Sequence, residues 1–248
     1  MFLYPGSHGN AGLKYNPFKA IVSPRPIGWI TSHSIDKSLN LAPYSFFNAI
    51  CEQPAMVMFS SSPKKETLSE KDSLLNIIET EEFVVNIVSY SLRNEMNISA
   101  GNYPRGVSEI EKAGLKIAES KTVSVPRIES SPAALECRLW DAIELPKQND
   151  SSKTTMIVGT VTGIHINEQF LKDGKIDVSL YQPMARLGYM DYACIKETFS
   201  IKRPSWNNSL ARKVLIKGLI KVNDLFSHIY KLADAVIYFL KINDYMVS

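Results

Sequence analysis

Between about residue 20 and residue 203, apolar residues come in short runs separated by clusters of Gly, Pro, Asn, Asp and Ser. Such runs, rich in β-branched and aromatic residues, predict β-strands joined by turns. The predicted strands are Ile27 to His33, Asn40 to Ile50, Ala55 to Phe59, Phe83 to Val88, Ala133 to Leu145, Thr154 to Asn167, Ile176 to Tyr181 and Phe199 to Lys202. Helical patterns cover Lys65 to Thr80, Ser91 to Ala100 and Ser108 to Ala113. Because neighbouring strands connect through hairpins, an antiparallel barrel is favoured over a doubly wound sheet.

The pattern changes after Arg203-Pro204. Apolar residues from Leu215 to Leu240 recur at three- and four-residue steps, which predicts an amphipathic helix. We therefore expect two parts, a β domain over residues 1–204 and a helical C-terminal extension over residues 205–248. The apolar face suits packing on the barrel or on a partner subunit. A basic membrane-surface helix is the alternative, since lysines and Arg212 occupy the other face.

Composition narrows the function classes. The chain has 248 residues and a net charge of +3, and its lysines are scattered, so no nucleic-acid partner is expected. Three cysteines without a C-x-x-C spacing favour a reducing cytoplasmic location over a disulfide framework, and no metal site is expected. The N-terminus does not have the pattern of a signal peptide, and no apolar run is long enough to span a membrane.

The stretch from Leu39 to Ser62 carries the candidate chemistry. Pro43 interrupts a predicted strand just before Tyr44-Ser45-Phe46, and three serines precede Lys64 and Lys65. Proline inside a strand marks an edge or a bulge. An aromatic-lined bulge beside hydroxyls and cations suits a ligand with a planar ring at one end and a phosphate at the other. The alternative is a Pro-kinked core hairpin that ends in a polar loop.

Several segments, taken together and in order, resemble the flavin reductase-like, FMN-binding split-barrel family, which includes flavoredoxin. They are Arg25 to Ser32, Asn40 to Asn48, Lys71 to Ser73 with Asn76, Glu82 to Asn86, Gly163 to His165, and Arg186 to Gly188 with Asp191 to Ala193. The resemblance covers roughly residues 15–204. It implies a mainly β fold, a six-stranded antiparallel Greek-key split barrel with inserted helices, in a homodimer that binds FMN near its interface.

The function that the resemblance implies is an FMN-binding oxidoreductase. NADH or NADPH would serve as a transient electron donor, and electrons would pass on to free flavin, oxygen or an acceptor protein. The alternative is a flavoredoxin-type electron carrier without NAD(P)H activity of its own. Since the flavin supplies the redox chemistry, no catalytic side chain is required. The C-terminal extension exceeds the usual family length, so we expect it to be dispensable for FMN binding.

The candidate FMN-binding residues lie mostly in these segments. Main-chain groups and side chains near the ring would come from Arg25, Thr31, Ser32, Asn40, Ala42, Pro43, Tyr44, Ser45 and Phe46. The candidate phosphate ligands are Ser60, Ser62, Thr67 and Lys71, because hydroxyls and free N–H groups at a helix start attract anions. The serines would otherwise cap the following helix.

Two further candidates follow from the resemblance. His165 lies in a G-x-H setting that occurs near the nicotinamide site of related reductases, although a strand histidine is more often structural. Arg186 would close over the flavin or bind the phosphates of a pyridine dinucleotide, as the guanidinium fork permits. Tyr189 stands where the family usually has a second glycine, so it is expected to narrow the mouth of the pocket. No G-x-G-x-x-G follows a strand, so no Rossmann site is expected.

Overall fold

The structure is a computed structural model that describes residues 1–64, 67–147 and 153–204. Packing divides the chain into two units, Met1–Thr198 and Phe199–Ser248. The first unit holds all the helices and strands of the described residues. The helix predicted within residues 205–248 lies outside the described residues.

The centre of the first unit is one antiparallel sheet of seven strands in the order β3-β2-β6-β9-β10-β5-β4. Its strands are β2 (Gly28–His33), β3 (Leu39–Tyr44), β4 (Phe47–Glu52), β5 (Ala55–Ser61), β6 (Glu82–Ile87), β9 (Ala133–Glu144) and β10 (Thr155–Ile166). Every pair in the sheet is antiparallel, as hairpin connections require. The predicted antiparallel split barrel is confirmed, with one more strand in the main sheet than expected.

The order of strands shows that the sheet curls into a barrel. β3 and β4 lie at opposite edges, yet only Ser45 and Phe46 join them in the chain. Two residues span less than about 10 Å, so the two edges have to meet at this point. The amide of Ser60 on β5 donates to the carbonyl of Phe46 at 2.9 Å, which holds the connection against the neighbouring strand.

Apolar side chains pack on both faces of β2, because this strand is buried along its whole length. Ile30 belongs to the cluster inside the barrel with Phe59 and Phe83, and Trp29 belongs to a second cluster with Leu41 and others outside it. The indole of Trp29 is fully buried and donates to the Ser99 hydroxyl at 2.8 Å. The two clusters form because successive side chains along a strand point to opposite faces of the sheet.

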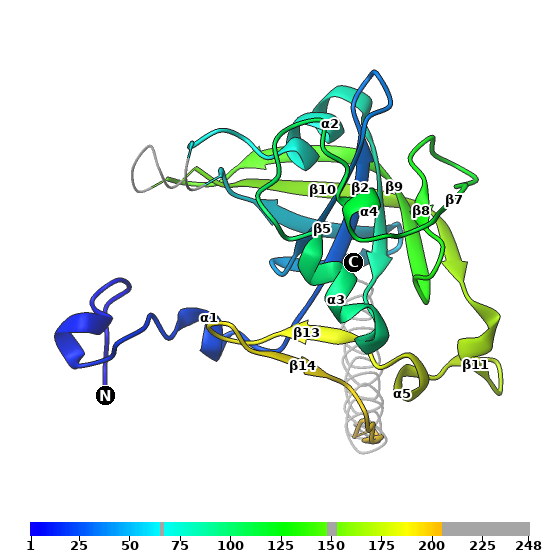
Figure 1. Ribbon diagram of the computed structural model, residues 1–248. Helices are drawn as coiled ribbons and strands as arrows, with labels where there is room; N and C mark the ends of the chain where they lie inside the picture. Colours follow the sequence, from blue (N-terminus) through cyan, green and yellow to red (C-terminus); the bar gives the residue numbers. More distant parts are fainter. Residues whose placement is uncertain (65–66, 148–152, 205–248) are drawn as a thin grey trace, which may run out of the picture. The chain divides into compact units, whose positions relative to one another are not determined.

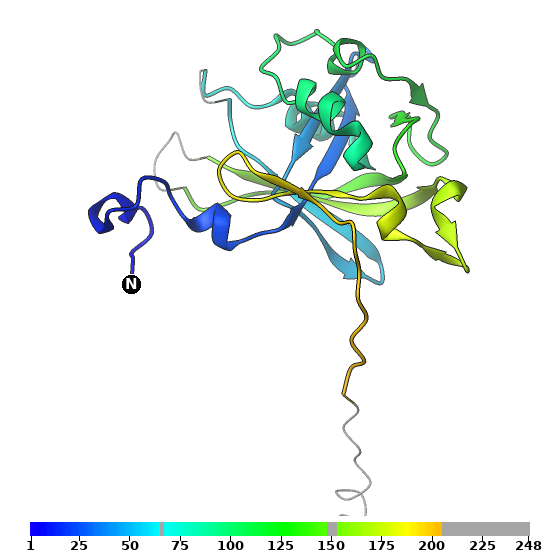
Figure 2. The ribbon, with the colours of Figure 1, turned by 60° about the horizontal axis from the view of Figure 1, so that its bottom comes forward.

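A smaller sheet lies beside the barrel and begins at the N-terminal arm (Figures 1 and 2). It has the order β1-β13-β14, from β1 (Arg25–Pro26), β13 (Met184–Arg186) and β14 (Tyr192–Cys194). The arm before it carries the 3-10 helix η1 (His8–Ala11) and the helix α1 (Phe18–Ile21). Segments from the two ends of the unit are thus joined in one sheet next to the end of β3.

The remaining elements are short and cover the barrel or extend its loops. The helices are α2 (Asp72–Thr80), η2 (Tyr90–Leu92), α3 (Arg93–Ile98), α4 (Glu109–Lys112), η4 (Glu168–Phe170) and α5 (Val178–Tyr181). The short strands pair as β7 (Ile117–Ala118) with β8 (Arg127–Ile128), and β11 (Leu171–Lys172) with β12 (Lys175–Ile176). No helix among the described residues is long and apolar enough to cross a membrane.

Four predicted elements differ from the structure. The strand predicted over Asn40 to Ile50 is two strands, because the chain passes between the barrel edges at Ser45-Phe46. The helix predicted from Lys65 begins at Asp72. Residues 178–181 form the helix α5 and not a strand, since the Asp177 carboxylate accepts from the Ser179 amide at 3.0 Å and caps it. The strand predicted over Phe199 to Lys202 is absent.

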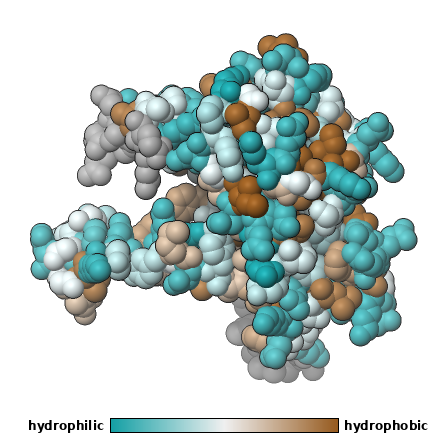
Figure 3. Space-filling model, viewed as in Figure 1, coloured by the Kyte–Doolittle hydropathy of each residue, from teal (hydrophilic) through white to brown (hydrophobic). Residues whose placement is uncertain are grey.

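Other predictions are confirmed. The glycine-rich strand over residues 154–167 is β10, and its register shifts beside Gly159 and Gly163 as expected for a curved strand. At Gly159 a Cβ atom would lie 2.4 Å from the ring of Phe83, so only glycine fits there. On the face seen in Figure 3, exposed apolar side chains form small separate groups among polar ones.

Candidate functional site

Three adjoining hollows follow β3 along its length, and we call them together the β3 cavity. The outer hollow, of about 460 Å³, includes Leu39 and Asn40. The loop hollow, of about 70 Å³, includes Asn40, Ala42, Pro43 and Tyr44. The arm hollow, of about 160 Å³, includes Pro43, Tyr44 and Ser45. Successive hollows share residues of β3, so one strand lines a continuous concave surface.

The arm hollow lies where the N-terminal arm and the small sheet meet the end of β3. Its other lining residues are Lys19, Arg25, Ile27, Met96, Arg186, Tyr189 and Tyr192. Two of these are opposite each other, since Arg25 on β1 pairs with Arg186 on β13. Like charges placed directly opposite across a ladder are unfavourable unless an anion lies between or beside them. The arm hollow is therefore a place where a negative group gains from both guanidiniums.

Arg25 is held rigidly although it is a buried cation. Its guanidinium donates to the carbonyls of Lys19 and Val22 and, at 2.8 Å, to that of Leu187. Burial lowers the pKa of Arg25, and the charge of Arg186 lowers it further. Its Nε atom is buried without a hydrogen-bond partner among the described residues. This side chain therefore ties the arm to the small sheet.

Arg186 and Tyr192 form the other wall of the arm hollow. The guanidinium carbon of Arg186 lies 4.2 Å from the ring centroid of Tyr192, which is a cation–π distance. The Arg186 guanidinium also donates to the carbonyl of Tyr189 at 2.6 Å. Tyr189 has a positive φ of 55°, lines the hollow and is half exposed. Its position in the lining fits the prediction that it narrows the opening.

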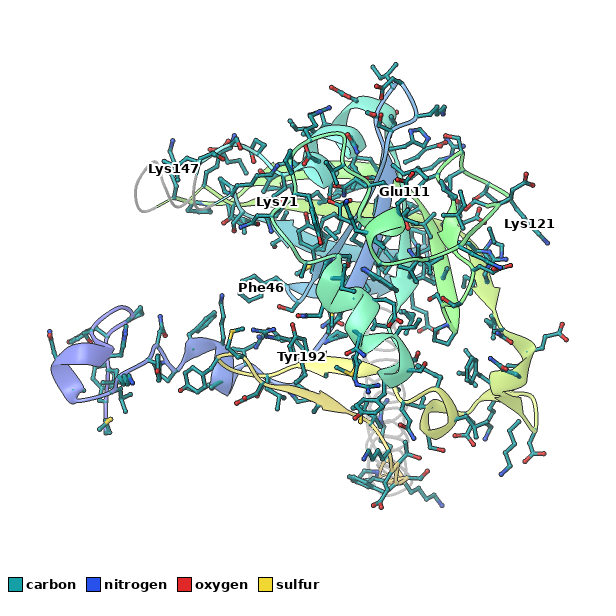
Figure 4. All side chains as sticks on the ribbon, in the orientation of Figure 1. Phe46, Lys71, Glu111, Lys121, Lys147 and Tyr192 are labelled. Carbon is teal, nitrogen blue, oxygen red and sulfur yellow. The ribbon has the colours of Figure 1, made fainter. Side chains whose placement is uncertain are left out.

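The loop hollow combines a phenol, cations and small groups. Figure 4 labels Lys71 and Phe46 on the body of the barrel and Tyr192 on the small sheet. The Nζ of Lys71 lies 5.2 Å from the ring centroid of Tyr44. Burial lowers the pKa of Lys71, and so does Lys64, which lines the same hollow. Burial raises the pKa of Tyr44, whose ring is 4% exposed and packs on Phe59 inside the barrel.

Two carboxylates border the loop and outer hollows. Asp72, in the first turn of α2, accepts from the ammonium of Lys64 at 3.0 Å and lies 3.7 Å from Arg105. Glu109 on α4 accepts from the amide of Leu41 at 3.0 Å, and burial raises its pKa. Asp72 thus has two cations beside it, Lys64 and Arg105. Among the described residues, no group of three or more His, Cys, Asp or Glu side chains is placed to hold a metal.

The structure brings eight of the fifteen predicted residues together in the β3 cavity. They are Arg25, Asn40, Ala42, Pro43, Tyr44, Ser45, Lys71 and Arg186. Phe46 lies beside it, exposed, with Lys19 and Arg25 at 5.7 Å and 5.8 Å from its ring centroid. Phe46 lies in the connection between β3 and β4, so its contact with Arg25 places that connection next to the arm hollow.

The predicted phosphate ligands are spread out, because α2 begins later than expected. Ser60 is on β5 opposite Met156, and Ser62 shares a hydrogen bond of 2.9 Å with Thr154. Thr67 is exposed and bonds to Ser69. Of these four candidates only Lys71, directly before α2, lines the cavity. The serines do not cap the helix.

Thr31 and Ser32 lie on β2, next to β3 as expected, but both are fully buried. The amide nitrogen of Asn86 donates to the Thr31 hydroxyl at 2.6 Å, and that of Asn76 donates to Ser32 at 3.3 Å. These bonds satisfy the hydroxyls within the protein. In this structure the two residues support β3 from behind and do not line the cavity.

His165 lies away from the β3 cavity. It is on β10 opposite Ala134, and its Nε2 bonds to the carboxylate of Glu136. Glu136 is fully buried and also accepts from the amide of Lys121 at 2.7 Å. The histidine is thus part of a network that fastens the loop around residue 121 to the barrel, which is the structural alternative.

Several lining residues were not predicted as site residues. In the arm hollow these are Lys19 from the arm and Met96 from α3, and in the loop hollow they are Ala100, Gly101 and Tyr103 from the segment after α3. No sequence pattern indicated that the segment after α3 faces this cavity. Tyr192 falls in a matched segment, so the resemblance contained a signal for it.

Comparison with known proteins identifies the family. The family described as flavin reductase like domain matches residues 22–186. This chain belongs to that family. A protein of Aquifex aeolicus is 35% identical over 175 residues, which cover 70% of this chain and 86% of the relative. The Bacillus subtilis protein YwrF is 29% identical over 207 residues, 83% of this chain and all of the relative.

Solved structures agree with this assignment. Nitrilotriacetate monooxygenase component B from Bacillus cereus superposes with a TM-score of 0.73 at 32% identity, covering 81% of this chain and 98% of that one. The 2-nitrobenzoate 2-nitroreductase NbaA of Pseudomonas fluorescens gives 0.67 at 31% identity, with coverages of 79% and 95%. Flavoredoxin of Desulfovibrio vulgaris, at 21% identity and 0.61, shares the fold. Family membership supports an oxidoreductase function that uses a flavin.

The residues of the β3 cavity fit a flavin nucleotide. A flavin mononucleotide combines a flat ring system with a dianionic phosphate. The cavity offers the ring of Tyr192, held by Arg186, and the cations Lys19, Lys71 and Arg186. The two acids of the loop hollow are already engaged, Asp72 by Lys64 and Glu109 by Leu41, and the outer hollow also has Asp36 and Glu79 in its lining.

Proposed function

We propose that this protein binds FMN in the β3 cavity and reduces it with NADH or NADPH, after which the electrons pass to a second acceptor. The observation that carries the proposal is the convergence on one strand of aromatic rings and cations from the arm, the small sheet, the segment before α2 and the segment after α3. Bound FMN would supply hydride acceptance from the nicotinamide and onward electron release. The protein would contribute binding, orientation and charge.

The proposed roles of the side chains follow from their contacts. Lys71 and Arg186 line the cavity, so they would attract the phosphate or the pyrophosphate of a dinucleotide. Main-chain groups of Ala42 to Ser45 line two hollows and would meet the polar edge of the ring. Asn40, which donates to Ser73 at 2.8 Å, would hold the far end of the cavity in shape. Phe46 would shield the opening beside Arg25.

A homodimer is part of the proposal. It rests on the family resemblance and would place the flavin near the interface. Light scattering on the full chain tests it, with a mass of twice 27.8 kDa expected. A mass of one chain would remove the dimer from the account.

The rival function is a flavin electron carrier that is reduced by a protein partner. Two neighbours at 32% and 31% identity are a monooxygenase component and a nitroreductase by name, which favours an enzyme. The flavoredoxins are more distant. Reduction of a nitroaromatic by the bound flavin is a second candidate, favoured by the 31% identity to NbaA.

Anaerobic mixing separates these possibilities. The FMN-loaded full chain is mixed with NADH or with NADPH in a stopped-flow cell, and the visible flavin absorption is followed. Rapid bleaching supports the reductase. Persistence of the flavin colour with both nucleotides, together with bleaching by dithionite, supports the carrier. Adding 2-nitrobenzoate to the bleached protein then tests the nitroreductase, because return of the colour without oxygen requires that acceptor.

A further inference from the structure

A separate apolar hollow of about 320 Å³ adjoins the β3 cavity, and we call it the α3 hollow. Tyr90 and Arg93 from the start of the α3 region form one side, and Met184 and Cys194 from β13 and β14 form the other. Met96 and Tyr192 line both this hollow and the arm hollow. A volume of this size is sufficient for a small organic molecule.

The inner walls of the hollow suit a flat apolar ring. Met96 and Met184 are 2% and 8% exposed and belong to the apolar cluster around Trp29, so they form a firm floor. Thioether side chains adapt to irregular shapes and make favourable contacts with aromatic rings. Tyr192 adds a ring that is already held in place by its cation–π contact with Arg186. An aromatic ligand would therefore bury its ring against two sulfurs and a phenol.

The rim of the hollow is cationic. The guanidinium carbon of Arg93 lies 4.3 Å from the ring centroid of Tyr90, and the Nζ of Lys196 lies 6.0 Å from the same centroid. Arg93 donates one hydrogen bond, to the carbonyl of Tyr90 at 3.0 Å. Neither cation forms an ion pair within residues 1–64, 67–147 and 153–204. A guanidinium has five donors, so Arg93 has capacity for a carboxylate.

The geometry points to a binding site for a small aromatic carboxylate in the α3 hollow. The ring would lie on Met96, Met184 and Tyr192, and the carboxylate would pair with Arg93 at the rim. Tyr192 and Met96 would separate this ligand from the neighbouring arm hollow. That the ligand lies beside a flavin rests on the proposed function; the binding itself does not, because all of its contacts come from this chain.

Cys194 gives a direct readout of occupancy, since its thiol belongs to the lining and is partly exposed. Of the two other cysteines, Cys51 is exposed and Cys137 is buried. In the full-length Cys51→Ser protein, the alkylation of Cys194 by iodoacetamide is followed by mass spectrometry. The protein is tested without flavin and again with FMN. Protection in the flavin-free protein depends on this site alone, so its absence is distinguishable from a failure to bind FMN.

Benzoate is expected to slow the alkylation of Cys194 at least fivefold in a saturable manner, and benzamide, its neutral counterpart, is expected to slow it less than twofold. Arg93→Met is expected to abolish the protection by benzoate without changing the unprotected rate. Lys112→Met, which removes an exposed cation on α4, is expected to leave the protection intact. Three results would overturn the proposal: protection by benzamide equal to that by benzoate, protection by benzoate that persists in Arg93→Met, or protection by NADH without any protection by benzoate.

A second measurement does not depend on thiol reactivity. The ¹⁹F signal of 4-fluorobenzoate is expected to broaden in the presence of the full chain and to sharpen again when Arg93→Met replaces it. A signal that stays sharp with the unmodified protein, or that broadens equally with both proteins, contradicts the assignment.

Discussion

The carboxylate of Glu109 accepts a hydrogen bond of 3.0 Å from the main-chain amide of Leu41. This contact joins α4 to β3 at the middle of the cavity, and it does so with a side chain that is only 8% exposed. β3 is an edge strand of the sheet, so one row of its amides has no strand partner. Glu109 satisfies one of these amides and fixes the strand that lines all three hollows.

Glu109 gives a first prediction, on stability against pH. Burial raises the pKa of Glu109, so the folded state keeps its proton to higher pH than the unfolded chain does. The stability gained from this proton is present below the ordinary pKa and is lost as pH rises through the raised value. Relative to the unmodified protein, Glu109→Gln is therefore expected to gain stability as pH rises from about 4 to 8. Urea unfolding at a series of pH values measures this, and a difference that does not change with pH contradicts it.

Glu136 gives a second prediction with the opposite sign. Burial alone raises its pKa, but hydrogen bonds from Thr122, His165 and the amide of Lys121 outweigh burial and lower the pKa to about 2. The resulting stability is present above the ordinary pKa of about 4.3 and is lost as pH falls toward 2. Glu136→Gln should cost about 1–3 kcal/mol at neutral pH, with the gap narrowing in acid. A gap of constant size between pH 7 and pH 3 in the same unfolding assay would refute it.

The proposed phosphate contact gives a third prediction. Lys71→Met removes a cation that lines the loop hollow next to the Tyr44 ring. FMN binding should weaken about tenfold, near 1.4 kcal/mol, whereas riboflavin, which has no phosphate, should bind as before. Quenching of flavin fluorescence measures both affinities, and Lys112→Met is the control. Equal losses for the two flavins would show that Lys71 contacts the ring or shapes the hollow.

The attachment of the N-terminal arm gives a fourth prediction. A Cβ atom at Gly188 would lie 2.5 Å from the Cβ of Ala20 and 2.8 Å from its Cα. Gly188→Ala must therefore push the arm away from the small sheet, at a cost of about 1–3 kcal/mol. Limited proteolysis should cut the arm faster, and the melting temperature should fall. Gly9→Ala, where a Cβ meets nothing within 4 Å, serves as the control. Unchanged cleavage in Gly188→Ala would mean that the arm does not need this close contact.

The barrel could be predicted from the sequence because each long strand is a distinct apolar run rich in β-branched and aromatic residues. The strand predicted over Thr154 to Asn167 is β10, and its register shifts lie beside Gly159 and Gly163. The break at Ser45-Phe46 could not be predicted in this way, because it depends on which edges of the sheet meet. The same holds for β13 and β14, which are only three residues each and pair with β1 from the other end of the unit.

The site was predictable in part for a similar reason. Residues on or beside β3, such as Asn40, Pro43 and Ser45, share one strand, so their convergence follows from local structure. Ser60, Ser62 and Thr67 were chosen for a helix start, but that helix begins at Asp72. The buried guanidinium of Arg25 donates to the carbonyl of Lys19 and so holds Lys19 at the site. This contact exists only in the folded arm, so no local sequence pattern predicted it.

The most direct test of the central claim is a calorimetric titration of the flavin-free full chain with FMN, repeated on Ser45→Trp. Ser45 lines the arm hollow and is only partly buried, so an indole there fills the hollow from its edge. The account predicts one FMN per chain for the unmodified protein and at least a tenfold weaker affinity for Ser45→Trp, with the melting temperature of the flavin-free protein unchanged. Absence of FMN binding to the unmodified protein, or equal affinity for the two proteins, would contradict it.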